Sequence, residues 1–284
     1  MRLTNSNLVR KTTLFFCIVL VFGVVSPWNT KAIGNIIGGI KKDIDPDKTS
    51  DLIWVEQEFT NGDVYEGYIN AETGYIEGFG RYHWPDGDSC EGMWENGYLS
   101  GFGKYLWAEG ESYEGMYKEN LQSGYGVYRW VNGDIYEGMW ENGQRSGFGL
   151  ERYADGGSFA GMYNDGYRSG FGIEHYPNGG IYKGMWKDNK KTGFGVGHWA
   201  DGASYAGMWK DDKRTGYGVY HWTDEELYEG MWNNSLQSGL GIYRWADGGS
   251  FTGIWEDDDM TGFGVSRLAN GDTYYGMIKV EKSD

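Results

Sequence analysis

The histidines of this sequence are the side chains best suited to metal chemistry. His175, His198 and His221 stand 23 residues apart, and His83 falls in the same column of a repeating unit. Imidazole nitrogens bind zinc, but Zn–N bonds are only about 2 Å long. Equivalent side chains two strands apart in a sheet are separated by about 9.6 Å, so one ion cannot bridge them. We expect a solvated or Glu-paired basic column and no metal site.

Carboxylates that could act in acid–base catalysis also recur once per repeat. They include Glu66, Glu91, Glu114, Glu137 and Glu229, and this recurrence is typical of a scaffold surface rather than of one catalytic site. The acidic turns lack EF-hand spacing, and we interpret them as solvated edges. No phosphate-binding loop, nucleophile motif or zinc spacing is present in the sequence. The sequence therefore predicts a protein that is not an enzyme and needs no cofactor.

Composition separates this chain from ordinary globular proteins. It has 49 Gly, 14 Trp, 23 Tyr and 12 Phe in 284 residues, whereas glycine averages about 7% of residues. Disordered glycine-rich chains are poor in aromatic residues, so we expect this chain to fold and to use glycine structurally. The formal net charge of −16 repels phosphate backbones and anionic lipid surfaces. We expect no nucleic-acid partner.

Residues 1–32 resemble a secretory signal peptide. Arg2, Arg10 and Lys11 precede an apolar run from Leu14 to Val25, and small residues flank Lys31. The run is shorter than the ~20 residues that span a bilayer as a helix. We therefore predict cleavage near Ala32 and export to a secreted, periplasmic or lumenal location. The alternative is an uncleaved anchor that holds the chain at a membrane. Residues 33–50 are predicted to be a flexible linker.

The elements that position all these side chains are set by a 23-residue repeat. A glycine recurs at this interval from Gly92 to Gly276, and a Gly-aromatic-Gly triplet recurs from Gly78 to Gly262. In each unit two short stretches alternate with period 2, and Asn-Gly or Asp-Gly pairs separate them. These pairs tolerate the positive φ of tight turns, so the pattern predicts β-hairpins.

One unit shows a family resemblance. Residues 136–143 read Tyr-Glu-Gly-Met-Trp-Glu-Asn-Gly, and residues 147–149 read Gly-Phe-Gly. This pattern resembles the MORN (membrane occupation and recognition nexus) repeat over about residues 51–284. The resemblance implies an all-β fold, an elongated, twisted, single antiparallel sheet of stacked β-hairpins. We expect a cap strand at 51–64 and an array at 65–284 with nine full repeats and a C-terminal half repeat. Similar proteins act as scaffolds and dimerise.

Side-chain alternation assigns an aromatic and glycine-rich set to one face of the expected sheet. Two interpretations remain open for these rings: they form the core, or they line an aromatic groove for a ligand such as a glycan. The candidate groove residues are Tyr113, Tyr136, Trp140, Tyr182, Trp186, Tyr205, Trp209, Tyr228 and Trp232.

A methionine ladder is expected on the opposite face. It consists of Met93, Met116, Met139, Met162, Met185, Met208 and Met231. A single-layer sheet cannot bury both faces alone, and exposed apolar patches mark interaction sites. We therefore predict a non-catalytic scaffold, exported or membrane-tethered, that binds a protein partner or forms a homodimer through an apolar sheet face. The alternatives are a peripheral membrane or phospholipid-binding module and a secreted glycan-binding groove.

Overall fold

The computed structural model describes residues 51–278, with side chains described to Met277. The chain divides into two units, Met1–Asp51 and Leu52–Asp284, and the strands belong to the second. The predicted signal peptide and linker lie outside the described residues. No helix within residues 51–278 is long and apolar enough to span a bilayer.

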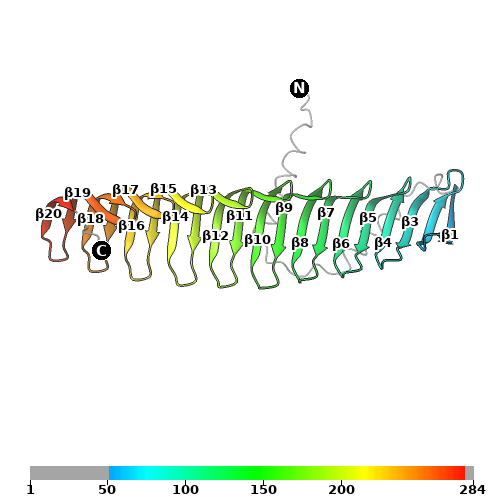
Figure 1. Ribbon diagram of the computed structural model, residues 1–284, viewed down its shortest axis with the longest axis horizontal. Helices are drawn as coiled ribbons and strands as arrows, with labels where there is room; N and C mark the ends of the chain where they lie inside the picture. Colours follow the sequence, from blue (N-terminus) through cyan, green and yellow to red (C-terminus); the bar gives the residue numbers. More distant parts are fainter. Residues whose placement is uncertain (1–50, 279–284) are drawn as a thin grey trace, which may run out of the picture. The chain divides into compact units, whose positions relative to one another are not determined.

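Twenty strands form one antiparallel sheet, and each strand pairs with its neighbours in the sequence from β1 (blue) to β20 (red) (Figure 1). The first strands of the hairpins are β2 (Val64–Asn70), β4 (Ser89–Glu95), β6 (Ser112–Lys118), β8 (Ile135–Glu141), β10 (Ser158–Asn164), β12 (Ile181–Lys187), β14 (Ser204–Lys210), β16 (Leu227–Asn233), β18 (Ser250–Glu256) and β20 (Thr273–Ile278). The second strands are β3 (Ile76–His83), β5 (Tyr98–Leu106), β7 (Leu121–Arg129), β9 (Gln144–Arg152), β11 (Tyr167–His175), β13 (Lys190–His198), β15 (Lys213–His221), β17 (Leu236–Arg244) and β19 (Asp259–Arg267). β1 (Leu52–Glu58) lies within the predicted cap segment and pairs with β2. The predicted all-β sheet of stacked hairpins is confirmed.

Two-residue turns close the hairpins from β4–β5 to β18–β19, whereas residues 71–75 connect β2 to β3. Asn142 and Gly143 connect β8 to β9 with φ values of 50° and 78°, and two consecutive positive φ values define the type I′ turn that matches strand twist. The turn side chains also tie consecutive repeats together. The Asp212 carboxylate accepts a hydrogen bond of 2.9 Å from the Lys191 backbone N–H, 21 residues earlier. The acidic turns therefore have a structural role in addition to the solvated edge we expected.

Glycine pairs let aromatic rings lie directly on the backbone. The Tyr136 side chain covers Gly138 and Gly149, where an added Cβ would approach its hydroxyl to 2.6 Å and its ring to 2.4 Å, respectively. The Tyr136 hydroxyl donates a 3.0 Å hydrogen bond to the Met139 carbonyl. These rings form an edge-to-face series across repeats, with Tyr136 5.2 Å from both Trp140 and Tyr163. The core is thus one layer of aromatic rings over one glycine-lined sheet face, which we call the inner face.

The first glycine of each triplet has a different role. Gly170 has φ +64°, a backbone conformation that is unfavourable for residues with a Cβ. At this point the pairing of β10 with β11 shifts register between Gly161 and Met162. The triplet therefore contains one glycine for a bulge and one, Gly172, for contact with a buried ring.

Candidate interaction surfaces

The predicted methionine ladder lies on the outer face of the sheet, opposite the rings. Met116, Met139, Met162, Met185, Met208 and Met231 are each 41–42% exposed. Met93 is half-buried. Methionine is flexible and polarizable, so it adapts to irregular partner surfaces.

A second exposed column accompanies the methionines, and sequence analysis missed it as a surface. Phe171 pairs directly across the sheet with Met185, and Phe194 pairs with Met208. The column occupies the middle position of every triplet and contains Phe79, Phe102, Tyr125, Phe148, Phe171, Phe194, Tyr217, Leu240 and Phe263; all are exposed except Phe102, which is half-buried. Alternation could have revealed it, because the middle residue of the triplet directly precedes the inner-face glycine and so points to the opposite face. The methionines and this column together are called the outer stripe.

Polar residues border the outer stripe. The Tyr125 hydroxyl donates a 2.5 Å hydrogen bond to the Glu137 carboxylate, which also pairs with Arg152 at 3.3 Å. The histidines of the basic column are exposed on this face. Across the described part of the chain, no group of three or more His, Cys, Asp or Glu converges on a metal-sized space. The border is thus a polar rim of the kind found around protein interfaces.

The nine residues of the candidate aromatic groove lie on the inner face and are 0–7% exposed: Tyr113, Tyr136, Trp140, Tyr182, Trp186, Tyr205, Trp209, Tyr228 and Trp232. Their burial matches the core interpretation. A ligand role for these rings stays a prediction. Burial also raises the pKa values of the five tyrosines in this set, as for Tyr205, where the pKa reaches about 12.

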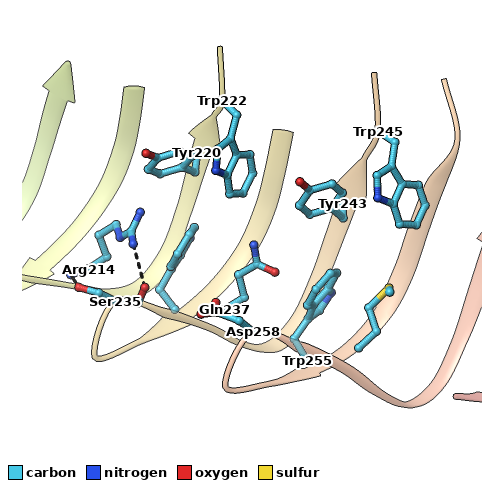
Figure 2. Close-up of a pocket in the computed structure, with 11 residues that line it drawn as sticks. Arg214, Tyr220, Trp222, Ser235, Gln237, Tyr243, Trp245, Trp255 and Asp258 are labelled. Carbon is cyan, nitrogen blue, oxygen red and sulfur yellow. Dashed lines mark hydrogen bonds between the residues drawn. The ribbon is translucent and has the colours of Figure 1, made fainter. Parts of the chain in front are cut away.

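A second layer of half-buried rings lies above this core. It includes Tyr220, Trp222, Tyr243 and Trp245, whose neighbouring ring centroids are 4.5–5.5 Å apart. These rings line one side of a pocket of about 470 Å³, while Arg214 and Gln237 lie on the other side (Figure 2). The accessible aromatic surface of the inner face is therefore formed mainly by residues outside the predicted groove set.

A cationic column lies on the inner face, at the second residue of β9, β11, β13 and β15. Arg145, Arg168, Lys191 and Arg214 stand in four consecutive repeats. Arg145 pairs with Glu151 at 2.6 Å, and Arg168 pairs with Glu174 at 2.8 Å. This column was not predicted from the sequence, although its 23-residue spacing is visible there. It places positive charge in the interior face of an acidic protein.

Comparison with known proteins agrees with the repeat architecture. The MORN repeat matches nine consecutive stretches, at residues 74–89, 90–112, 113–135, 136–158, 159–181, 182–204, 205–225, 228–250 and 251–273. No curated protein matches this sequence.

Solved structures show only a distant likeness. The wild-type TCP10 domain of Danio rerio CPAP is 10% identical with a TM-score of 0.39, covering 80% of this chain and 100% of that chain. The CPAP G-box domain, from a structural analysis that suggests a role in centriole elongation, is 10% identical with a TM-score of 0.26. That match covers 80% of this chain and 100% of that chain. At such scores the likeness carries no information about the partners of this chain.

Proposed function

This chain belongs to the MORN-repeat family, and we propose that it is a non-catalytic scaffold that binds a protein partner, or a second copy of itself, through the outer stripe. The observation that carries this proposal is the continuous exposure of paired residues such as Phe194 and Met208, which are 59% and 41% exposed. Monomeric proteins rarely expose long apolar patches without a function. A polar rim around an apolar centre is the usual anatomy of a protein interface.

A protein partner is favoured over an anionic membrane by charge. The chain carries a net charge of −16, and carboxylates such as Glu137 and Glu229 border the outer stripe. Anionic headgroups attract basic surfaces. Peripheral membrane binding is therefore the second candidate, and the experiment below separates it from protein binding.

We also propose that the scaffold is exported after cleavage near Ala32, with an uncleaved membrane anchor as the alternative. The support is the basic and apolar pattern of residues 1–32. The full chain would be expressed in its native host, the cells fractionated, and the N-terminus of the recovered protein sequenced. A mature N-terminus near residue 33 in a soluble exported fraction is the expected result. An intact N-terminus in the membrane fraction would support the anchor instead.

The outer stripe is tested by site-specific photo-crosslinking in the native host. A photoreactive amino acid replaces Met185 in one variant and Tyr167, an exposed residue outside the stripe, in the control. We expect protein crosslinks at position 185 that are absent at position 167. A product of twice the chain mass indicates self-association. Crosslinks to lipid alone would favour the membrane alternative, and equal crosslinking at both positions would contradict a stripe interface.

A substitution series completes the test. Replacing Phe171, Met185 and Phe194 with Ser should abolish the crosslinked product, because it removes the centre of the stripe. Replacing Val131 and Tyr167 with Ser is the matched control, since both side chains are exposed outside the stripe. Circular dichroism should show that both variants keep their sheet.

A further inference from the structure

The cationic column of the inner face is paired in only two of its four repeats. Arg145 and Arg168 contact Glu151 and Glu174, which stand six residues after each cation. The equivalent position after Lys191 is Gly197, and after Arg214 it is Tyr220. Among the described residues, no ion pair involves Lys191 or Arg214. The two halves of the column therefore differ: Arg145 and Arg168 form ion pairs, whereas Lys191 and Arg214 interact only with carboxylates beyond ion-pair distance. These carboxylates are Glu174 and Asp212 for Lys191, and Asp258 for Arg214.

Lys191 lies in a small aromatic pocket. Its Nζ is 5.1 Å from the Tyr176 ring, 5.0 Å from the Tyr182 ring and 5.5 Å from the Trp209 ring. A pocket of about 230 Å³ is lined by this lysine, Gly197 and Trp199. Burial lowers the pKa of Lys191, so a carboxylate that entered this pocket would stabilise the charged ammonium.

Arg214 has a similar setting in the next repeat. Its guanidinium carbon is 4.3 Å from the Trp232 ring and 4.9 Å from the Tyr220 ring. One nitrogen donates a 2.9 Å hydrogen bond to the Ser235 carbonyl, as Figure 2 shows. Arginine has five N–H donors in a fork that fits a carboxylate.

The nearest turn carboxylates already accept backbone hydrogen bonds. Asp212 accepts from the Lys191 N–H at 2.9 Å, and Asp258 accepts from the Gln237 N–H at 2.6 Å. A partly buried cation without a carboxylate partner is unfavourable unless it gains one. Charge complementarity thus selects an anionic ligand for these two pockets.

The distance between the two pockets matches the rise of a polyproline II helix. Successive repeats are two strands apart, which is about 9.6 Å. One turn of polyproline II contains three residues and advances about 9.3 Å. Trp199, Trp222 and Trp245 recur at the same interval along the pockets. Polyproline II segments dock on aromatic-lined grooves, so the ring spacing and the cation spacing both match one ligand.

We propose that Lys191, Arg214 and the tryptophans of these pockets bind a proline-containing acidic segment of a protein partner in polyproline II conformation. Carboxylates three residues apart lie on one face of such a helix and pair with the two cations. The intervening prolines pack on Trp199, Trp222 and Trp245. This site lies on the opposite face from the outer stripe, so it goes beyond the proposed function and does not depend on it.

Binding is measured with a labelled synthetic peptide of about four Pro-Pro-Glu units by fluorescence anisotropy, using the full chain at low ionic strength, where screening is weak. We expect saturable binding. A Pro-Pro-Gln peptide should bind at least about tenfold more weakly, because one charge-assisted contact corresponds to about a factor of ten. A peptide of the same composition with its glutamates grouped together should also bind more weakly.

Two variants locate the site. Lys191→Met with Arg214→Met should weaken binding by about tenfold or more. Lys190→Met with Lys213→Met removes the same charge from exposed residues and should bind normally. Gly197→Glu restores the carboxylate of the preceding repeats and should block the peptide. The atoms nearest to a Cβ at Gly197 belong to the Trp199 ring, at 3.5 Å or more, which is ordinary contact distance, so this variant should fold.

Absence of binding to the Pro-Pro-Glu peptide, or unchanged binding by Gly197→Glu, contradicts the site. Equal binding of the grouped-glutamate peptide contradicts the polyproline II register. Photo-crosslinking from position 185 should be the same in all these variants. Loss of peptide binding with retained crosslinking separates this site from the outer stripe.

Discussion

The two faces of each strand have different roles although both are rich in apolar side chains. Tyr205, on the inner face of β14, is fully buried, whereas Met208 on the outer face of the same strand is 41% exposed. Inner-face rings lie on glycine and contact rings of the next repeat. Outer-face residues pair across neighbouring strands, as Phe194 does with Met208. The difference shows that apolar content alone does not identify the core of a single-layer sheet; close approach to the backbone does.

Alkaline pH should produce the largest effect, because it acts on many inner-face tyrosines together. Burial raises the pKa of Tyr205 and, with the Asp63 hydrogen bond, that of Tyr82 to about 12, above the reference value of 10.0. A raised folded pKa means that the neutral ring is favoured in the fold. This stability is complete below pH 10 and is lost as the pH rises through 12. Circular dichroism and tyrosinate absorbance should change together in this interval. Ionisation of all tyrosines without loss of sheet signal would contradict burial.

Removal of one aromatic ring should destabilise the protein more on the inner face than on the outer face. Tyr205→Ala should lower the free energy of unfolding by about 3–5 kcal/mol, the usual cost of removing a buried aromatic ring. Phe194→Ala on the outer face should cost less than about 1 kcal/mol, as surface substitutions do. Thermal and urea unfolding measure both. Similar losses for the two variants would show that the outer stripe is part of the core of the isolated chain.

Ion pairs on the two faces should also differ in how much they contribute to the free energy of unfolding. Glu151 is buried, contacts Arg145 and Arg168, and accepts hydrogen bonds from Tyr153 and Tyr163. Glu151→Gln should therefore cost about 3 kcal/mol, because it removes the ion pair of the partly buried Arg145, while Arg168 keeps its pair with Glu174. Glu137→Gln breaks a more exposed outer-face pair with Arg152 and should cost about 1 kcal/mol or less. If urea unfolding gives equal values, the inner network is more solvated than its burial indicates.

Glycine substitution gives the smallest expected change and the closest matched pair. Gly230 and Gly276 occupy the same repeat position, but a Cβ at Gly230 would be 2.6 Å from Gly241 Cα and the Tyr228 hydroxyl. At Gly276 a Cβ meets nothing within 4 Å. Gly230→Ala should cost about 1–3 kcal/mol through overpacking, and Gly276→Ala should be neutral. If thermal unfolding shows the same loss of stability for both variants, contact with the Tyr228 ring is not the reason that glycine is required at position 230.

Much of the fold could be predicted from local sequence signals. Period-2 alternation predicted the strands, Asn142-Gly143 and its equivalents predicted the turns, and the 23-residue interval predicted the repeating units. The stacking of the hairpins into one sheet was implied by the resemblance to the MORN repeat. The Met185 column was placed on the correct face for the same reason. The column from Phe79 to Phe263 and the cations near Lys191 were missed, although the same interval would have revealed both. The pairing of Arg168 with Glu174 needed the structure, because it depends on side chains that meet across the sheet surface.

The sequence by itself determined the hairpins, their number and the composition of each face, because alternation and turn chemistry act within a few residues. Only the tertiary structure decided which apolar face became the core. The Gly138 and Gly149 pair brings the Tyr136 ring onto the backbone, and the bulge at Gly147 sets the path of the second strand. The tertiary structure also left Lys191 and Arg214 beside open pockets, because the carboxylate position of their repeats holds Gly197 and Tyr220. Both outcomes depend on contacts between strands and between repeats, which no single segment of the sequence contains.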